Sequence, residues 1–363
     1  MSASADQIAR LRLIRSDNVG PVTYFQLLAR FGSAEAALTA IPELAARGGG
    51  RAPRLATRAQ VEREMEAVAR LGASYVFLGS GEYPALLAEL ETAPPALIVR
   101  GHIHLLARPV IAMVGARNAS AAACRFARQL AQGIGEAGAV VASGLARGID
   151  SAAHDGSLAS GTIAVIAGGI DIVYPPENEA RQQAIARQGL LIAEQPPGTE
   201  PRARHFPYRN RIIAGLAHGT VVVEAAPRSG SLITARFAAE FGREVMAVPG
   251  SPLDPRAQGC NQLIREGATL VQNADDVLEA IRPLHLGPLA QGSAGYGAAP
   301  IPPDAEDAER KVVTDLLGPT PVGTDEVIRQ SGLAPAIVQT VLLELELAGR
   351  LERHAGGRVS LAG

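Results

Sequence analysis

The segment VIAMVGARNAS, residues 110–120, is a run of apolar and β-branched residues that ends in glycine and continues as a polar turn. Similar runs, each followed by a segment of helical length, span residues 110–115, 139–144, 162–168, 190–193, 220–223, 245–248 and 269–271. Continuous apolar strands that alternate with helices are typical of parallel sheets covered on both faces. The sequence therefore predicts an α/β fold, a Rossmann-like doubly wound and mostly parallel sheet that binds ligands at the carboxyl ends of its strands.

The composition indicates a globular protein with more than one core. The chain has 363 residues, of which 47% are hydrophobic and 19% are charged. It contains no run of 18 apolar residues and no basic-then-apolar leader, so we expect a cytoplasmic protein without a membrane segment. Cys124 and Cys260 lie far apart without a CxxC motif, which argues against a disulfide framework or a zinc cage.

The total charge gives no indication of a partner, because 34 basic residues nearly balance 36 acidic ones. The regions on either side of the sheet are more informative. Apolar positions at helical spacing over residues 8–38, interrupted at residues 18–21, predict two helices joined by a glycine turn. Such a turn can bind a phosphate, as in helix-hairpin-helix modules, but it also occurs in ordinary small helical bundles.

The end of the chain has the pattern of a winged helix. Helices are expected near residues 305–317, 324–331 and 335–348, and a hairpin over residues 350–361. The third helix lacks lysine and arginine and contains Glu344 and Glu346, so we interpret it as a protein-contact element rather than a DNA reader. The predicted domains are residues 1–70 (helical), 71–283 (Rossmann-like), 284–305 (flexible linker) and 306–363 (winged helix).

The first two loops at the strand ends carry groups that bind phosphate. The turn after residue 114 lacks the second glycine of GxGxxG, which weakens the case for NAD. It still offers Gly115, Arg117 and the helix-capping Ser120. The loop after residue 142 combines Ser143, Gly144, Arg147 and Gly148, so backbone N–H groups and a guanidinium could share one anion.

Two further loops complete the set. Between residues 202 and 211, four arginines are interleaved with Phe206 and Tyr208, which suits a single-stranded nucleic acid, although a solvated loop with anchoring aromatics fits equally well. The segment 224–234 follows a strand and opens a helix with Ser229, Gly230, Ser231 and Thr234. Together the four loops predict a continuous phosphate-binding surface at one edge of the sheet.

Catalytic chemistry has little support in the sequence. The chain has no HExxH, GxSxG, P-loop or paired-carboxylate motif. Asp150 and His154 are spaced i, i+4, but two ligands do not make a metal site. We therefore expect no catalytic residue, no cofactor and no metal.

Five ordered motifs over about residues 70–275 resemble the DNA-processing protein A family, DprA, also called Smf. They are SGLARGIDSAAH, AGGIDIVYPPEN, FPYRNRIIAGL, VVVEAAPRSGSLITARFAAEFGREVMAVPG and GCNQLIREGA. The resemblance implies a non-catalytic dimer that binds and protects single-stranded DNA in natural transformation and helps to load the RecA recombinase. It also implies an extended Rossmann fold, a helical domain like a sterile-alpha-motif domain in front and a winged helix behind.

The resemblance also implies which residues bind DNA. It assigns the basic pocket to Arg117, Arg147, Arg209 and Arg211, and close contacts to Gly144, Gly148, Ser229, Gly230 and Ser231. Asp150, His154 and Asn210 would hold the loops in place. The alternative is a nucleotide-processing phosphoribohydrolase of the lysine-decarboxylase-like Rossmann group, whose PGGxGTxxE motif corresponds here to APRSGSLITA, without the glutamate.

Overall fold

The computed structural model describes residues 4–282, 304–354 and 356–362. The chain divides into two compact units, one formed by Met1–Arg63 together with Gln291–Gly363 and the other by Glu64–Ala290. In the parts that the structure describes, no helix is long and apolar enough to cross a membrane.

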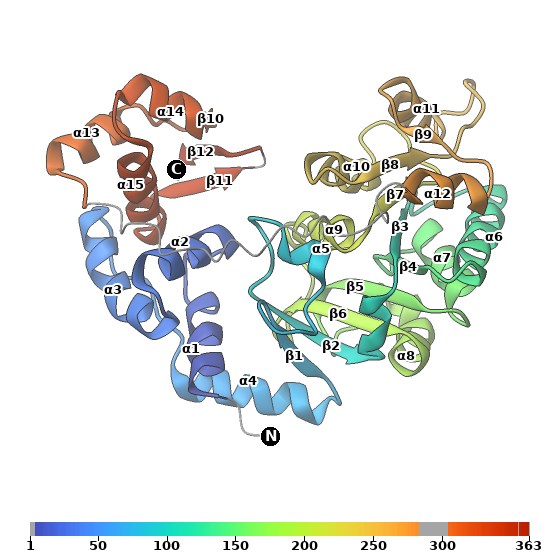
Figure 1. The fold of residues 1–363 in the computed structure, drawn as a ribbon, viewed down its shortest axis with the longest axis horizontal. Coiled ribbons are helices and arrows are strands. Elements are labelled where there is room, and N and C mark those ends of the chain that lie inside the picture. The colour runs from blue at the N-terminus through green and yellow to red at the C-terminus, as the bar shows by residue number, and fades with distance from the viewer. Residues whose placement is uncertain (1–3, 283–303, 355, 363) are drawn as a thin grey trace. The chain divides into compact units, whose positions relative to one another are not determined.

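The Glu64–Ala290 unit is built on a nine-stranded sheet in the order β1–β2–β6–β5–β4–β3–β7–β8–β9 (Figure 1). Its strands are β1 (Ser74–Phe77), β2 (Ala96–Gly101), β3 (Val110–Val114), β4 (Val140–Ser143), β5 (Thr162–Gly169), β6 (Leu190–Gln195), β7 (Gly219–Val222), β8 (Glu244–Ala247) and β9 (Thr269–Leu270). The strands from β6 to β9 across the sheet are parallel, whereas β2 runs antiparallel to β6 and β1 antiparallel to β2. The predicted doubly wound, mostly parallel sheet is confirmed.

Strand β3 lies at the point where the winding direction reverses. Ala112 is paired with Ala142 of β4 on one side and with Thr220 of β7 on the other. From β3 the chain adds β4, β5 and β6 in one direction, then returns beside β3 and adds β7, β8 and β9 in the other. The loops that follow β3, β4, β5 and β6 therefore emerge at the same edge of the sheet.

Helices cover both faces of this sheet, which explains why its strands are apolar throughout. Ile111 and Met113 of β3 pack with α6 (Ala121–Glu136), α7 (Ile149–Ser157) and α12 (Ala274–Ile281). Val110 and Ala112 point to the opposite face. The helices on that face are α5 (Ala85–Ala88), α9 (His205–Leu216), α10 (Gly230–Glu240) and α11 (Gln258–Arg265). Helix α8 (Glu179–Gln188) packs in a separate cluster near β5 and β6.

The other unit contains both ends of the chain. Its first part holds α1 (Ala5–Ile14), α2 (Pro21–Phe31) and α3 (Ala34–Arg47), and α4 (Arg58–Arg70) leads into the sheet unit. Its second part holds α13 (Asp307–Asp315), α14 (Thr324–Ser331), α15 (Pro335–Leu347) and the small sheet β10–β12–β11. The strands of that sheet are β10 (Val322–Gly323), β11 (Leu351–His354) and β12 (Arg358–Leu361). The helical domain and the winged helix are both present as expected.

Two of the predicted domains belong to the same compact unit in the structure. The sequence treats the N-terminal helices and the winged helix as separate domains, whereas they fall into one compact unit. Most of the predicted linker, residues 284–305, lies outside the described residues. Its last two positions are packed: Asp304 pairs with Arg47, and Ala305 is buried in the winged-helix core.

Candidate nucleic-acid interface

A pocket lies at the carboxyl edge of the parallel strands. It is formed by the loops after β3, β4, β5 and β6, together with the end of β5. Its lining residues are Arg117, Gly144, Ala146, Arg147, Ile166, Ala167, Gly168, Ile172, Tyr174, Pro175, Pro201, Phe206 and Arg209. Three of the four loops expected from the sequence contribute to this pocket, and the loop after β5 lines it in place of the expected loop after β7.

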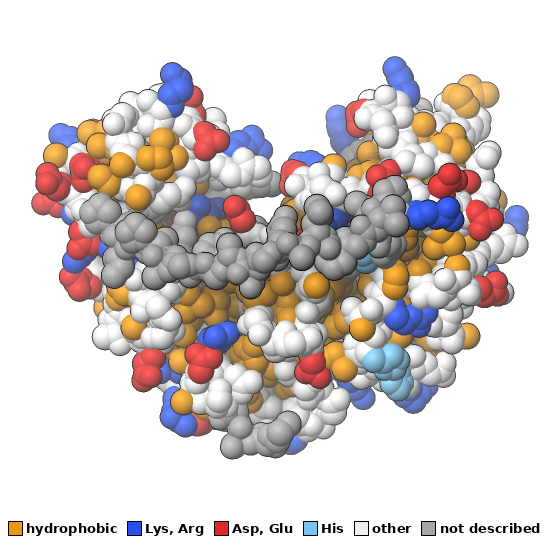
Figure 2. Space-filling view, viewed as in Figure 1, with side chains coloured by type: hydrophobic (Ala, Val, Ile, Leu, Met, Phe, Trp, Pro, Cys, Tyr) orange, Lys and Arg blue, Asp and Glu red, His pale blue; other side chains and the backbone are white. Residues whose placement is uncertain are grey.

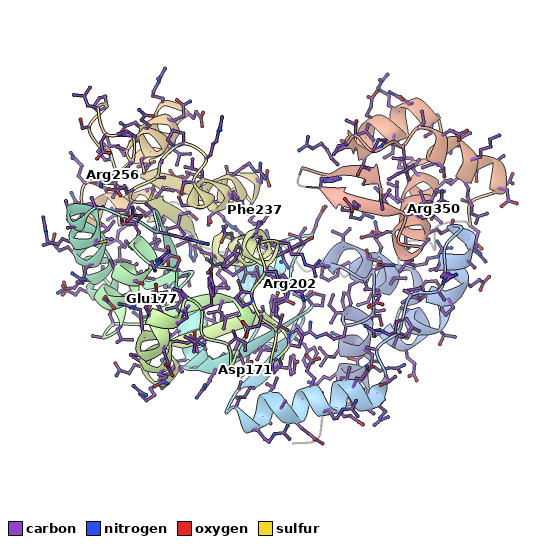
Figure 3. All side chains as sticks on the ribbon, turned by 180° about the vertical axis from the view of Figure 1, so that it is seen from behind. Asp171, Glu177, Arg202, Phe237, Arg256 and Arg350 are labelled. Carbon is purple, nitrogen blue, oxygen red and sulfur yellow. The ribbon has the colours of Figure 1, made fainter. Side chains whose placement is uncertain are left out.

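The loops beside the pocket carry charges of both signs. Asp171, Glu177 and Arg202, labelled in Figure 3, come from the loops that follow β5 and β6. On the face shown in Figure 2, basic and acidic side chains are likewise interspersed. An anion at the pocket would therefore be attracted by the local arrangement of its arginines.

An arginine and two aromatic rings form one side of the pocket. The guanidinium of Arg117 lies over the ring of Phe206, 4.9 Å from its centroid. The rings of Phe206 and Tyr174 are 5.6 Å apart and tilted by 52°. Tyr174 is 45% exposed, so its ring is available to a ligand. This arrangement offers a cation for a phosphate beside a flat apolar surface for a base.

The loop after β4 presents Arg147 to solvent. Its side chain is 64% exposed, and its Nε lies 3.6 Å from the carboxylate of Glu177. Leu145, two residues earlier, has the unusual backbone φ of 55°. Asn178 stabilises this turn by donating from Nδ2 to the Leu145 carbonyl at 2.8 Å, and Asp150 accepts the Ala146 N–H at 3.3 Å. A strained backbone that is held by several contacts is a common feature of binding sites.

Arg209 lies beneath the pocket and does not extend into solvent. It is only 6% exposed, and its Nη1 donates to the carbonyls of Gly144 and, at 2.7 Å, Val165. Burial lowers the pKa of Arg209 to about 10, while Asp150 opposes the shift. The guanidinium therefore remains charged at neutral pH and adds positive potential from below, instead of forming the free phosphate clamp that the sequence predicted.

Arg211 does not belong to the pocket, which corrects the sequence expectation. It is 5% exposed and pairs with Glu194 of β6 at 2.6 Å. It also donates to the carbonyl of Thr92 at 2.6 Å. A guanidinium that is buried and already neutralised by a carboxylate has little to offer a phosphate.

The three predicted loop-organising residues have different outcomes. Asp150 lies under the β4 loop, and burial raises the pKa of its carboxyl group. Asn210 accepts from Arg209 Nε at 3.1 Å and donates to the carbonyl of Gly230 at 3.3 Å, so it joins α9 to the start of α10.

His154 does not organise the pocket, contrary to the prediction. It is buried within α7, where its Nδ1 is 2.8 Å from the hydroxyl of Thr162, the first residue of β5. Burial lowers the pKa of His154 to about 3, so its ring is neutral. His154 follows Asp150 by one helical turn, about 6 Å along α7, which brings its ring to the start of β5 while Asp150 bonds to the β4 loop.

The helix N-terminus after β3 is occupied by a protein carboxylate. The Ser120 hydroxyl donates to Glu224 Oε2 at 2.7 Å, and the Ser120 N–H donates to Oε1 at 3.0 Å. In dinucleotide-binding Rossmann folds this position takes the pyrophosphate. Ser120 therefore has an internal anion as its partner, and its contact with phosphate stays a prediction.

Several of the predicted glycine and hydroxyl contacts are used within the protein. Ser143 is buried and donates to the Met113 carbonyl at 2.6 Å, and Thr234 is 1% exposed. A Cβ at Gly148 would collide with the backbone of Ala116, and one at Gly115 with Ile149. These two glycines allow the loops after β3 and β4 to touch each other, whereas Gly144 lines the pocket.

The turn before α10 lies outside the pocket lining. Ser229 caps this helix, and its hydroxyl lies 2.8 Å from that of Ser231. Gly230 is exposed and is joined to the pocket through Asn210. The sequence indicated Phe206 as one of two rings that suit a single-stranded nucleic acid, but it did not single out Tyr174. Both belong to the motifs FPYRNRIIAGL and AGGIDIVYPPEN, and an aromatic residue beside proline in a strand-end loop was the available signal for Tyr174.

Comparison with known families explains this combination of domains. Residues 74–282 match the family described as DNA recombination-mediator protein A. The chain belongs to this family. Residues 4–67 match the DprA-like N-terminal HHH domain, and residues 297–357 match the DprA winged helix domain.

Relatives of known name agree with this assignment. The DNA processing protein DprA of Streptococcus pneumoniae is 48% identical over 54% of this chain and 70% of its own length. The protein Smf of Escherichia coli is 39% identical over 77% of this chain and 75% of its own.

Two solved structures are similar. DprA from S. pneumoniae has a TM-score of 0.62 at 35% identity and is matched over 77% of this chain and 98% of its own. DprA from Helicobacter pylori, described for its single-stranded DNA binding mode, has a TM-score of 0.52 at 28% identity, over 58% of this chain and 95% of its own. Among the described residues there is no group of three or more potential metal ligands.

Proposed function

We propose that this protein is a recombination mediator that binds single-stranded DNA in the pocket at the carboxyl edge of its sheet. The observation that carries the proposal is the cluster of Arg117, Phe206 and Tyr174, where a guanidinium lies against one ring and a second ring is exposed beside it. The recombination-mediator family and the single-stranded DNA named for the H. pylori relative support it.

The geometry favours a single strand over a duplex. A flat aromatic surface binds a base only through its face, and in a duplex that face is stacked on its neighbours. In a single strand one base can rest on Tyr174 while the adjoining phosphates meet Arg117 and Arg147. Arg209 contributes its charge from beneath, through the Gly144 loop that it supports.

The strand extends past the pocket toward the start of α10. There the exposed Gly230 and the hydroxyls of Ser229 and Ser231 offer further backbone and hydroxyl contacts. Arg211, Ser120, Ser143 and Thr234 are not part of this proposal, because each is bonded or buried within the protein.

We propose further that the protein acts without catalysis, as a homodimer in the cytoplasm, and hands its DNA to the RecA recombinase. The family resemblance and the description as a recombination mediator support this part. The alternative, a nucleotide-processing phosphoribohydrolase, is not favoured by the comparisons, which match DprA domains along the chain.

The test compares two exposed tyrosines of similar accessibility. Tyr174 lines the pocket, whereas Tyr208, 54% exposed on α9, does not. Tyr174→Ala is expected to weaken binding of a fluorescent oligo-dT by about 5- to 150-fold, since stacking of one base contributes ~1–3 kcal/mol. Tyr208→Ala is the control and should change the affinity less than twofold. Preference for a duplex of the same length, or equal losses in both variants, would overturn the proposal.

A further inference from the structure

Helix α15, Pro335–Leu347, has two buried faces. One face carries Val338, Val341, Leu342 and Leu345 and lies in the core of the winged helix. The other carries Leu343 and Leu347, which belong to the core formed by α1, α2 and α3. A helix with apolar residues on two faces requires both faces to be covered. The N-terminal helices supply the cover that the winged helix lacks.

Polar bonds cross the same contact. Asn18, in the turn between α1 and α2, donates from Nδ2 to the carbonyl of Leu347 at 3.1 Å. The side chains of Gln26 and Gln339 are bonded at 3.1 Å. Arg30 donates to the hydroxyl of Thr340 at 3.3 Å. These bonds reach the turn, the middle of α2 and both halves of α15.

Glycine brings the two backbones together at the end of α3. A Cβ at Gly48 would collide with the carbonyl of Glu344, and one at Gly50 would lie 2.6 Å from the Cβ of Ala348. Arg350 donates to the carbonyl of Gly48 at 3.0 Å. The GGG sequence at residues 48–50 therefore permits an approach that any side chain at Gly48 would block.

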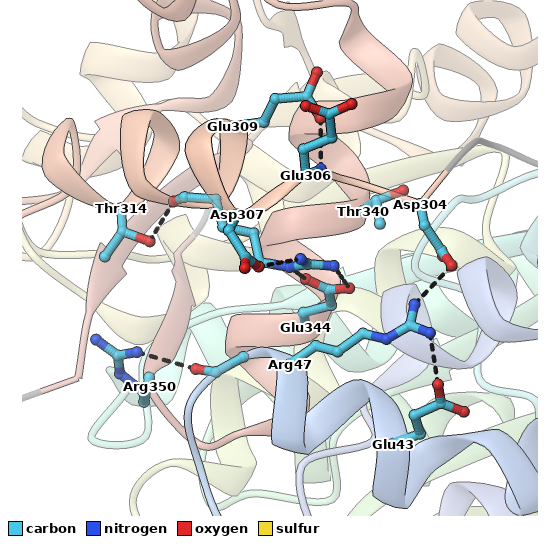
Figure 4. A network of polar contacts seen from close by, with 12 residues as sticks. Glu43, Arg47, Asp304, Glu306, Asp307, Glu309, Thr314, Thr340, Glu344 and Arg350 are labelled. Carbon is cyan, nitrogen blue, oxygen red and sulfur yellow. Dashed lines mark hydrogen bonds and ion pairs between the residues drawn. The ribbon is translucent and has the colours of Figure 1, made fainter.

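Ionic contacts close the edge of this interface (Figure 4). Arg47 pairs with Glu43 at 2.6 Å and with Asp304 at 2.8 Å, and Asp304 also bonds to Arg30. Glu344 of α15 is completely buried and is neutralised by Arg310 at 2.8 Å. Glu344, one of the two glutamates from which the sequence predicted that α15 does not read DNA, is thus paired inside the protein with α13.

We propose that α15 is the shared core helix of one terminal domain. This domain joins the two ends of the chain, and its internal contacts cover two potential DNA-binding elements at once, α15 itself and the glycine turn between α1 and α2. In helix-turn-helix proteins the helix equivalent to α15 lies in the major groove. Here its surface is occupied by the N-terminal helices. The glycine turn between α1 and α2, the other candidate, is held by Asn18 to the end of α15. The surfaces of α15 and of the glycine turn that could contact duplex DNA are therefore in contact with each other's part of the domain instead.

The experiment uses the full chain with a specific protease site inserted among residues 284–303. After cleavage, the fragment that carries the winged helix should stay bound to the rest and co-elute in size-exclusion chromatography. Gly48→Ala should release it, because φ of −70° at residue 48 suits alanine while the new Cβ meets Glu344. Gly323→Ala is the matched control, since φ is −66° there and no atom lies within 4 Å of the added Cβ.

A second variant keeps the test decisive if Gly48→Ala fails to fold. Asn18→Gly removes the side-chain bond to Leu347 but retains the backbone, because φ is 62° at residue 18 and glycine accepts it. It should weaken retention of the cleaved fragment about two- to tenfold, the effect of one hydrogen bond. Separation of the wild-type fragments on cleavage, or protection of α15 amides from hydrogen exchange by added duplex DNA, would overturn the proposal.

Discussion

Substitution of Arg147 tests whether the pocket binds phosphate. The side chain is 64% exposed and pairs with Glu177 at 3.6 Å, so its removal should change the free energy of unfolding by less than ~1 kcal/mol. Removal of Arg147 should also change how the affinity for single-stranded DNA depends on salt concentration. Each phosphate contact on a single strand contributes about −0.7 to the slope of log K against log salt.

The magnitude follows from that slope. Loss of one contact should weaken binding about eightfold at 0.05 M salt and about threefold at 0.2 M, with a slope flatter by about 0.7. Glu177→Gln should act in the opposite direction and strengthen binding by up to about fivefold, because Arg147 no longer shares its charge with a carboxylate.

The assay is a titration of oligo-dT by fluorescence anisotropy at four salt concentrations. Arg128→Ala provides the control, since it removes the same charge from a side chain that is 49% exposed on α6 and does not line the pocket. The control should leave the slope unchanged. If Arg128→Ala flattens the slope as much as Arg147→Ala, or if neither does, the arginine of the β4 loop does not contact phosphate.

Two buried groups give further predictions. Arg209→Ala removes bonds to the Gly144 and Val165 carbonyls and should cost the fold at least ~2 kcal/mol. A lowered melting temperature in calorimetry checks this, and an unchanged one would show that the bonds are dispensable. His154 has its pKa lowered to about 3 in the fold, so the unfolded chain binds a proton first as the pH falls below 6.5. Stability should therefore decrease from pH 6.5 toward pH 3, by up to ~1.4 kcal/mol per pH unit. Urea unfolding of His154→Leu should show a weaker pH dependence than the wild type, and an identical profile would refute this assignment.

The sequence by itself determined the elements and the class of fold. The run 110–115 predicted β3 within one residue of its end, and the run 245–248 predicted β8 within one residue at each end. These patterns are local, because burial on both faces of a sheet requires consecutive apolar residues wherever a strand lies. The helices of the winged helix were predicted in the same way. Residues 8–38, where two helices were predicted, contain α1, α2 and the start of α3, because Gly32 at a φ of 73° ends α2 and Ser33 caps a new helix.

The tertiary structure decided which charges face solvent. Arg209 and Arg211 lie in one arginine-rich segment with Arg202 and Arg204, and nothing in their local spacing distinguishes them. Arg211 is neutralised by Glu194 of β6, and Arg209 is held by the carbonyls of Gly144, just after β4, and Val165, within β5. Partners that are brought together by sheet order leave no trace in local spacing.

Helix α15 shows the same division. Its apolar residues and the absence of lysine and arginine were visible in the sequence and indicated a protein contact. The identity of that contact was not, because Leu343 and Leu347 would be equally apolar against any partner. Only folding brings them to the core of α1, α2 and α3, where Gly48 leaves room for the approach. Hydrophobic burial is non-directional, so a sequence states that a surface must be covered, and the packed structure determines what covers it.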